Sequence, residues 1–468
     1  MLFNTFQFGI FLAFVLLFYY GLPRKFRGAT LLVASLIFYT MWAPVYLLLL
    51  LAEIGVNYAL LRTMLRSKHR LPYLLSAIVF TLGLLAYFKY TAMILETLFP
   101  ALGGTFGWGF EIPEILLPLG ISFYSFQILG LTIDAYRDRL EEVPDLGKYA
   151  LFVCFFPQLI AGPILRGSEF LPQLRQGGQP TTDRTRRGLW LIAIGLGKKV
   201  IIADFLLAPF VNLVFNEYAP ASSAFHWVAL YSFAFQIYFD FSGYTDMARG
   251  IALLLGFELP MNFLEPYLSR NPSEFWRRWH ITLSRWLSDY VYIPLGGNRR
   301  GKPRTYLNLA LTMLLGGLWH GANWTFVIWG GLHGLLLIVH RLIRREKTEI
   351  IRPLGWRDAP KVFVFFNLVS LLWVFFRAPD LEFALRYFER LFAFSDSFGW
   401  PQIQMAVLAL CVGLHFAERS LRLHAPAIRS RLGDHWWGSL VEGAVLGAIL
   451  GLAIMVGGVG GDFLYFQF

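Results

Sequence analysis

The chain has 468 residues, of which 56% are hydrophobic and only 15% are charged. A water-soluble protein of this length does not need so much apolar surface, so the composition excludes an ordinary soluble enzyme and indicates a polytopic membrane protein. The formal net charge is +11, but the basic residues cluster between apolar stretches, as the positive-inside rule describes for cytoplasmic loops. The positive charge therefore does not indicate a nucleic-acid-binding protein.

Apolar stretches long enough to cross a bilayer recur along the chain. The first has no basic region before it and no small-residue cleavage site, so we interpret it as a retained helix. We expect an all-α polytopic fold with about eleven full crossings plus re-entrant segments. The clear stretches are 3–21, 28–61 (a pair split near Pro44), 72–98, 115–133, 188–215, 222–241, 322–340, 360–377, 403–417 and 439–459, and weaker ones lie near 148–163, 244–258 and 305–318.

Loop charges predict the topology. The basic loops near 24–27, 62–70, 341–347 and 419–431 should be cytoplasmic, whereas 99–114, 215–224 and 378–402 should face outward, which places both termini outside.

The stretch 148–163 is interrupted by Pro157, Gly162 and Pro163 and lies between two basic loops, so we expect it to enter and leave on one side. Irregular backbone at membrane depth requires a protein-lined or wet cavity, so this segment favours a cavity-forming core.

Residues 262–305 are polar enough to leave the membrane but rich in Trp and Arg. They predict an interfacial helix over 272–292 with its aromatic face toward lipid or core. Helical spacing places His280 on the flank of that face, four residues after Trp276, and places Arg277 and Ser284 on the adjoining polar edge. A structural hydrogen bond explains such a histidine as well as a catalytic role does.

The arginines of this region have two interpretations. They could anchor the protein to anionic lipid headgroups, or they could attract a phosphorylated substrate such as the nucleotide portion of coenzyme A. The set comprises Arg277, Arg278, Arg285, Arg299 and Arg300.

His320 is the strongest candidate for a reacting group. It lies between 305–318 and 324–340, and basic residues at both outer ends predict a hairpin with Trp319, His320 and Gly321 at its tip, within the membrane. A buried ionisable group is costly and usually functional, and imidazole exchanges protons near neutral pH. Gly316, Gly317 and Gly321 would allow close packing around the ring, whereas His333, inside the next helix, is expected to be structural.

Other polar and sulfur-containing residues have simpler explanations. Asp240, Asp246 and Arg249 interrupt an apolar stretch, either as functional acids or as an internal Asp–Arg pair that stabilises a broken helix. Cys154 and Cys411 have no metal-ligand spacing and are expected to be buried small apolar residues, so we predict no metal site.

Four segments together resemble the membrane-bound O-acyltransferase family: 236–247 (QIYFDFSGYTDM), 274–280 (EFWRRWH), 295–299 (LGGNR) and 316–323 (GGLWHGAN). With 156–166 and the closing residues 463–468, they resemble the bacterial branch that supplies acetyl groups to exopolysaccharides of the alginate and cellulose type. No low-complexity tail or polar linker divides the chain, so we expect one domain over 1–468, with N-terminal helices (1–98), a catalytic core (115–342) that includes the interfacial helix 272–292, and C-terminal helices (360–468). The resemblance implies a funnel and tunnel with His320 at the narrow point, His280 as the second family histidine, and an inner-membrane location. In an inner membrane, the outside termini that the loop charges predict are periplasmic.

O-acylation from a thioester needs a base, oxyanion stabilisation and exclusion of water. We expect His320 to be the base, His280 to orient the acyl group or move a proton, and Trp319 or Asn323 to donate to the oxyanion. Trp276, Arg277 and Ser284 would line the substrate path.

The leading hypothesis is transfer of acetyl from acetyl-CoA across the inner membrane to an exopolysaccharide, with no other cofactor. A periplasmic esterase-like partner is expected to complete the transfer, because the chain shows no Ser-His-Asp esterase-like domain. Alternatives are a non-catalytic transporter or flippase for a polymer precursor, and acyl transfer to a teichoic acid, lipid or protein.

Overall fold

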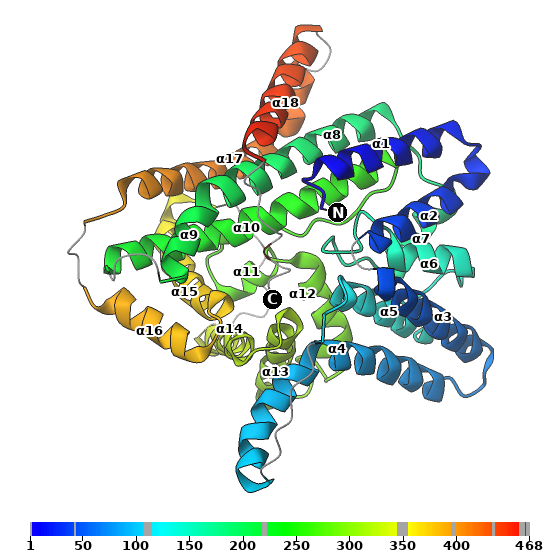
Figure 1. Cartoon of the computed structure of the whole chain (residues 1–468), viewed down its shortest axis with the longest axis horizontal. Coiled ribbons are helices and arrows are strands. Elements are labelled where there is room, and N and C mark those ends of the chain that lie inside the picture. The colour runs from blue at the N-terminus through cyan, green and yellow to red at the C-terminus, as the bar shows by residue number, and fades with distance from the viewer. Residues whose placement is uncertain are drawn as a thin grey trace. The chain divides into compact units, whose positions relative to one another are not determined.

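The computed structural model describes residues 2–41, 44–106, 115–217, 222–343, 354–394, 399–432, 436–457 and 464. Regular structure in these ranges is helical throughout, with no strand, which confirms the all-α prediction (Figure 1). The helices are α1 Phe6–Gly21, η1 Arg24–Phe26, α2 Arg27–Thr40, α3 Pro44–Arg66, α4 Leu71–Phe106, α5 Ile121–Tyr136, α6 Leu146–Cys154, α7 Gly167–Gln176, α8 Thr182–Leu196, η2 Gly197–Leu207, α9 Ala208–Phe215, α10 Ser223–Leu254, η3 Pro266–Leu268, α11 Pro272–Trp276, α12 Ile281–Leu287, η4 Ser288–Tyr292, α13 Lys302–His320, α14 Trp324–Ile343, η5 Trp356–Asp358, α15 Ala359–Arg377, α16 Leu381–Phe392, α17 Gln402–Leu432 and α18 Trp436–Val456.

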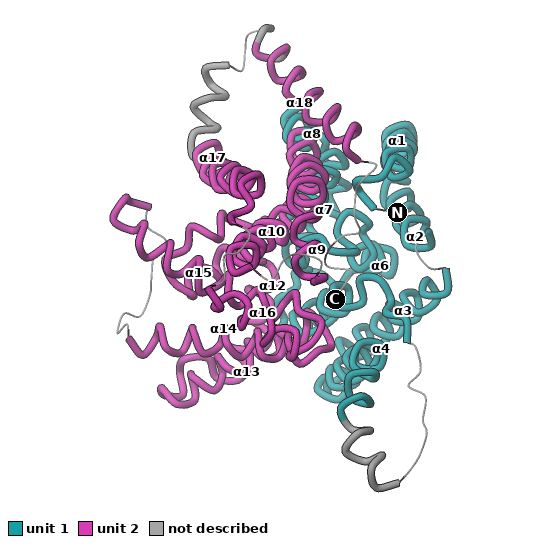
Figure 2. The backbone as a smooth tube through the Cα atoms, turned by 60° about the vertical axis from the view of Figure 1, so that its left-hand side comes forward, with its two compact units in different colours: residues 1–189, 248–260 teal, residues 190–247, 261–468 magenta. Residues whose placement is uncertain are grey.

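The chain divides into two compact units, coloured separately in Figure 2. Unit 1 comprises residues 1–189 and 248–260, and unit 2 comprises 190–247 and 261–468. The central Trp- and Arg-rich segment and both candidate histidines belong to unit 2. Organisation of 1–468 as a single domain stays a prediction.

Four segments are long and apolar enough to cross a membrane: α3, Leu71–Thr97 of α4, α14, and Trp356–Arg377. Two shorter apolar helices are Phe6–Gly21 and Leu440–Val456. A helix needs about 20 apolar residues to span the hydrocarbon core, so these segments agree with a multi-pass membrane protein. The predicted number of crossings, the funnel and the tunnel stay predictions.

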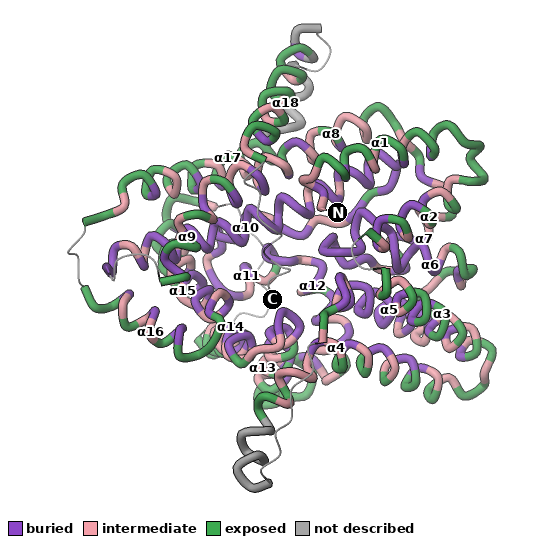
Figure 3. Tube along the Cα trace, viewed as in Figure 1, coloured by how far each residue is buried: buried purple, intermediate pink, exposed green. Residues whose placement is uncertain are grey.

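Several element boundaries follow the sequence closely. The predicted split near Pro44 falls between α2 and α3, and the predicted irregular stretch begins where α6 ends at Cys154. The expected break between 222–241 and 244–258 is wrong, because α10 runs uninterrupted from Ser223 to Leu254. Figure 3 shows α10 buried along most of its length, so neighbouring elements pack around the polar residues that suggested a broken helix.

Parts of some predicted segments lie outside the described residues: 107–114 and 218–221 in two predicted outward loops, 395–398 in a third, 344–347 in a cytoplasmic loop, and the closing motif except for Leu464.

Unit 1 packs mainly around α3, which contacts α2, α4, α5 and α6. Its last segment, 248–260, is tied back to α1, where the hydroxyl of Tyr19 donates to the carbonyl of Leu255 at 2.9 Å. Cys154 is buried within this unit and Cys411 within unit 2, both as free thiols, as the sequence predicts.

The α13–α14 pair in unit 2 packs as the predicted hairpin, and its re-entrant placement in a membrane stays a prediction. Gly317 and Gly330 face each other across the two helices, and a Cβ added at Gly330 would lie 3.1 Å from the Cα of Gly317 and would overlap the carbonyl oxygen of Met313. Glycine is therefore required here because the two backbones touch. His320 is the last residue of α13 and stands at the closed end of the hairpin.

Replacing Gly330 by Ala should destabilise the protein, because the new methyl group must push α13 and α14 apart. We expect a loss of about 1–3 kcal/mol, visible as a lower thermal unfolding temperature in detergent. Gly331→Ala is the matched control, since a Cβ there meets its nearest neighbour, Leu314 Cδ2, at an ordinary 3.5 Å. Equal unfolding temperatures for the two variants would contradict the packing argument.

Candidate active site

The segment 272–292 is not the continuous helix that its periodicity predicts. It forms α11, a turn over 277–280, then α12 and η4. His280 ends the turn with a left-handed backbone at φ 42° and ψ 55°. Such a conformation is uncommon for a residue with a side chain and persists only where the surroundings enforce it. The helical-wheel placement of His280 was therefore wrong, although the ring does point inward.

Residues 262–264 clamp this turn. The carbonyl of Asn262 accepts the N–H of Ile281 at 2.9 Å, and its side-chain Oδ1 accepts the hydroxyl of Thr282 at 2.6 Å. On the other side of the turn, the N–H of Leu264 donates to the carbonyl of Arg278 at 2.9 Å. Bonds on both sides of His280 thus fix its backbone and the direction of its ring.

A buried ion network supports the first part of the turn. Glu274 accepts from Arg270 Nε at 2.8 Å and from Arg278 Nη2 at 2.8 Å. Burial alone would raise the pKa of Glu274, but the bonds from Arg270 and Arg278 outweigh it and leave the pKa below its ordinary value. Arg278 also donates to the carbonyl of Leu264 at 3.0 Å. This arginine is committed to an internal carboxylate, which contradicts its predicted role in attracting a phosphorylated substrate.

The structure brings the two candidate histidines together. The ring centroids of His280 and His320 lie 6.4 Å apart. Both side chains are almost fully buried, with exposed fractions of 0% for His280 and 4% for His320.

Aromatic rings enclose this pair on several sides. The ring of Trp319 lies 5.7 Å from His280 and 5.1 Å from His320, between centroids, and Phe241 lies 4.8 Å from His280. His320 also meets Trp329 at 5.1 Å and Phe376 at 5.2 Å, both edge to face. We call His280, His320 and these four aromatic residues the ring cage. It comes from α10, the turn, and α13 to α15, so only the folded chain assembles it.

Burial in the ring cage sets the protonation of His280. Loss of hydration lowers the pKa of this imidazole from 6.5 to about 3. At physiological pH the ring is therefore neutral, with one nitrogen able to donate a hydrogen bond and the other able to accept one.

The other predicted site residues lie at different distances from the pair. Trp319 belongs to the ring cage, and Trp276 touches its outer side through Trp329, 5.8 Å away between ring centroids. Ser284 donates to the carbonyl of Trp279 at 3.1 Å and so fastens α12 to the turn. Arg277 is exposed, and its Nε donates to the carbonyl of Ser273 at 3.1 Å.

Asn323 acts as an anchor for the hairpin tip. Its amide donates to the carbonyl of Pro379 at 2.6 Å, and its Oδ1 accepts the N–H of Thr325 at 2.9 Å, which caps the start of α14. These contacts give Asn323 a structural role, and its contact with substrate stays a prediction.

Sequence reasoning missed Trp329 and Phe376. Trp329 was hidden inside an apolar stretch, and its one local signal was its position four residues before His333, on the same face of α14. The ring of His333 stacks on Phe275 at 5.9 Å and meets Trp329 at 4.7 Å, and its two nitrogens have no hydrogen-bond partner among the described residues.

Sequence reasoning also missed Lys198 and Lys199, two cations inside the apolar stretch 188–215. Lys199 bonds Asp240 at 2.6 Å and Asp204 at 2.9 Å, and Lys198 bonds Asp246 at 2.7 Å. The acids of α10 therefore have lysine partners on η2, and the predicted break in this helix is wrong. Two lysines in an otherwise apolar stretch were the signal, because buried cations need carboxylates.

A carboxylate from α17 also belongs to this network. Glu418 lies 2.5 Å from Lys198 and accepts the hydroxyl of Tyr238 at 2.7 Å. The N–H of Leu464 donates to Asp240 at 3.2 Å. The network thus links η2, α10, α17 and a residue near the end of the chain.

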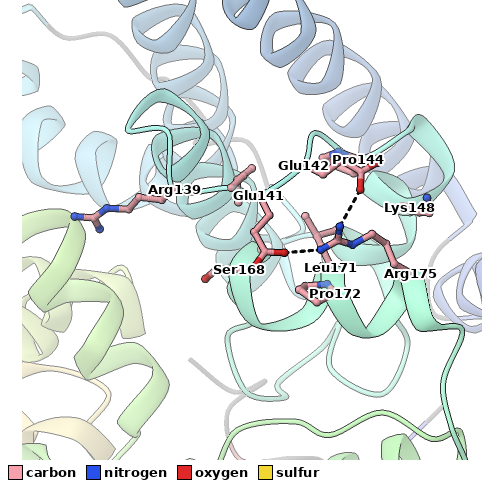
Figure 4. Close-up of a pocket in the computed structure, with 11 residues that line it drawn as sticks. Arg139, Glu141, Glu142, Pro144, Lys148, Ser168, Leu171, Pro172 and Arg175 are labelled. Carbon is pink, nitrogen blue, oxygen red and sulfur yellow. Dashed lines mark hydrogen bonds and ion pairs between the residues drawn. The ribbon is translucent and has the colours of Figure 1, made fainter.

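In a surface pocket of unit 1, charged side chains of the lining pair with one another. Figure 4 shows Arg175 directed between two carboxylates, with 2.8 Å to Glu141 and 2.9 Å to Glu142. Neither the lining of this pocket nor that of a cavity beside η4 in unit 2 contains a ring-cage histidine.

Comparison with known proteins identifies relatives of the chain. Residues 35–376 match the membrane-bound O-acyltransferase family. A probable alginate O-acetylase of Azotobacter vinelandii is 43% identical over 399 residues, covering 84% of this chain and 78% of the relative. A peptidoglycan O-acetyltransferase of Helicobacter pylori is 40% identical, covering 80% and 76%. A teichoic acid D-alanyltransferase of Streptococcus thermophilus is 29% identical, covering 61% and 72%.

Loosening the clamp on the turn should reduce both stability and transfer activity. Thr282→Val removes the hydroxyl that binds Asn262, at an expected cost of about 1 kcal/mol. Thr325→Val makes the same chemical change at a buried threonine whose hydroxyl has no partner among the described residues, so it should be neutral or slightly stabilising. Thermal unfolding and transfer rates of the two variants provide the measurement. A larger effect at position 325 would contradict the clamp.

Lowering the pH should destabilise the protein through His280. The unfolded chain binds a proton at this ring below pH 6.5, whereas the folded chain does not until near pH 3. The free energy of unfolding should therefore fall by about 1.4 kcal/mol per pH unit below that point. His280→Asn tolerates the left-handed backbone and cannot titrate, so its unfolding temperature should fall less between about pH 7.5 and about pH 5.5. Parallel pH profiles would refute this assignment.

Proposed function

The chain belongs to the membrane-bound O-acyltransferase family, and on that premise we propose that it moves acetyl groups from cytoplasmic acetyl-CoA across the inner membrane for O-acetylation of a secreted polysaccharide. Membership makes it a membrane O-acyltransferase, and relatives named as a probable alginate O-acetylase and a peptidoglycan O-acetyltransferase support acetyl as the group transferred. The single observation that carries the proposal for this chain is the pair of buried imidazoles, 6.4 Å apart between ring centroids.

In the proposed step, His320 is the general base. A neutral imidazole accepts the proton of the acceptor hydroxyl while that oxygen attacks the thioester carbonyl carbon. The new C–O bond forms, the C–S bond breaks, and the proton held by His320 passes to the departing thiolate. The aromatic surroundings of His320 support this role, because apolar walls exclude the water that would hydrolyse the donor.

His280 is proposed as the group that orients the acyl carbon. Its neutral ring can donate one hydrogen bond toward the carbonyl oxygen as negative charge develops there. The clamp on the turn supports this role, because a donor must be held in place before the reaction to stabilise a transition state. Trp319 is the proposed second donor.

Passage across the membrane requires a route that reaches His320. A tunnel open to both faces, an inner-membrane location with periplasmic termini, and one domain over 1–468 are parts of this proposal. The immediate acceptor is proposed to be either the polysaccharide or a periplasmic esterase-like partner that completes the transfer.

Alginate-type exopolysaccharide is the acceptor class that the relative in Azotobacter vinelandii supports. Peptidoglycan is a second candidate, because the Helicobacter pylori relative is 40% identical. Mass spectrometry of the secreted glycan and of the cell wall from a deletion strain would separate the two. A transporter without catalysis is distinguished by acetyl-CoA turnover, since it would consume no thioester.

Replacing His320 by Ala should abolish polymer acetylation while leaving membrane insertion intact. Loss of a general base costs on the order of 10²–10⁴ in rate. His69→Ala is the control, since His69 is exposed on a loop of unit 1. Acetyl ester on the polymer and protein in the membrane fraction are measured together. Wild-type ester with His320→Ala would overturn the assignment of the base.

A further inference from the structure

A second feature of unit 2 lies at the end of α13 opposite to His320. A cavity of about 550 Å³ opens there, lined by η4, the glycine-containing loop 293–300 and Arg341 of α14. Ligand sites for small molecules fall in this size range. The cavity is lined by three arginines, Arg299, Arg300 and Arg341.

These arginines have no carboxylate partner among the described residues. Other arginines of the chain do have carboxylate partners. Arg175 of unit 1 lies between two glutamates, and buried Arg278 pairs with Glu274. Three like charges around one cavity repel each other, so the arrangement favours an anion that they share. Guanidinium groups match the oxygens of a phosphate in paired hydrogen bonds.

The loop that carries two of these arginines is held in place from beneath. Asn308 of α13 is fully buried, and its amide donates to the carbonyls of Gly297 at 3.0 Å and Leu295 at 3.3 Å. Gly296 adopts φ 112°, and a Cβ there would lie 2.8 Å from Arg300 Cδ. Glycine therefore permits both the backbone and the path of the Arg300 side chain across the loop.

The same helix relates this cavity to the reacting histidine. Asn308 precedes His320 by twelve residues on α13 (320 − 308), which is about 18 Å along the axis at 1.5 Å per residue. A nucleotide thioester carries its acyl group at the end of a long flexible arm, so its phosphates and its carbonyl carbon are bound at separate places.

We propose that Arg299, Arg300 and Arg341 bind the phosphate groups of the acyl donor, a nucleotide-linked thioester, while its acyl end reaches His320. This inference rests on the proposed function, because it assigns the donor end of the same reaction. It also changes the arginine set suggested by the sequence. Arg299 and Arg300 remain, Arg341 is added, and Arg277, Arg278 and Arg285 are left out because they do not line the cavity. The phosphate of an anionic lipid headgroup shares the chemistry, and the experiment separates the two sources.

The test uses the full-length protein in nanodiscs of neutral lipid. The variants are Arg299→Gln with Arg300→Gln together, Arg341→Gln alone, and Lys302→Gln as control. Lys302 is exposed, lies two residues beyond Arg300 and is outside the cavity lining, so its replacement makes the same charge change nearby. KM and kcat are measured with acetyl-CoA and with acetyl-pantetheine, which lacks every phosphate.

We expect the cavity variants to raise the KM for acetyl-CoA on the order of tenfold or more, with kcat changed far less. The KM for acetyl-pantetheine should be unchanged by these variants, and Lys302→Gln should match the wild type with both donors. An equal KM shift for both donors, or no shift for acetyl-CoA, would overturn the proposal.

Binding of unacetylated coenzyme A, measured by calorimetry, separates this inference from the proposed function. Weaker binding by the cavity variants supports the phosphate site even if the wild type transfers no acetyl group. Nanodiscs containing phosphatidylglycerol test the lipid source. Variants that lose phosphatidylglycerol-dependent stability while binding coenzyme A normally would assign the arginines to a headgroup and refute the donor site.

Discussion

The left-handed backbone at His280 is the constraint on which the active-site geometry depends. A helix continued through 277–280 would carry this ring around the helix axis, whereas the turn directs it toward His320 and Trp319. The conformation is unfavourable for a residue with a side chain, by about 1–3 kcal/mol. Hydrogen bonds from Asn262 and Leu264 on either side of the turn offset that cost and make the direction of the ring a property of the fold.

Buried charges hold the surrounding elements of unit 2 in register. Glu274 joins Arg270 and Arg278 beneath the turn, while Lys199 joins Asp240 and Asp204 between η2 and α10. Removing one partner from a buried pair leaves an uncompensated charge, at a cost of about 3–5 kcal/mol. These networks therefore specify which helices meet, and the apolar side chains around them supply most of the contact area.

The hairpin α13–α14 links the ring cage at one end to the arginine-lined cavity at the other. Glycine contacts close its helices against each other, its closed end presents His320 to the ring cage, and its open end carries Arg341 beside the arginine loop. A rigid helix between the proposed base and the proposed anion-binding cavity would fix the separation of the two ends of the proposed donor. The buried amide of Asn308 makes the loop part of that rigid element.

Composition and loop charge by themselves determined an all-α membrane protein, because apolar length and basic flanks are local properties of the chain. Four motifs likewise pointed to His280 and His320, and basic residues around 305–340 predicted the hairpin that the structure contains. Only the tertiary structure decided that the helix breaks before His280, since periodicity assumes a continuous helix and Asn262, eighteen residues away, imposes the turn. The tertiary structure also decided the pairing of Lys199 with Asp240 and the contact of Phe376 with His320. A buried lysine signals that it needs a carboxylate, but the local sequence does not show which residue on another helix it will meet.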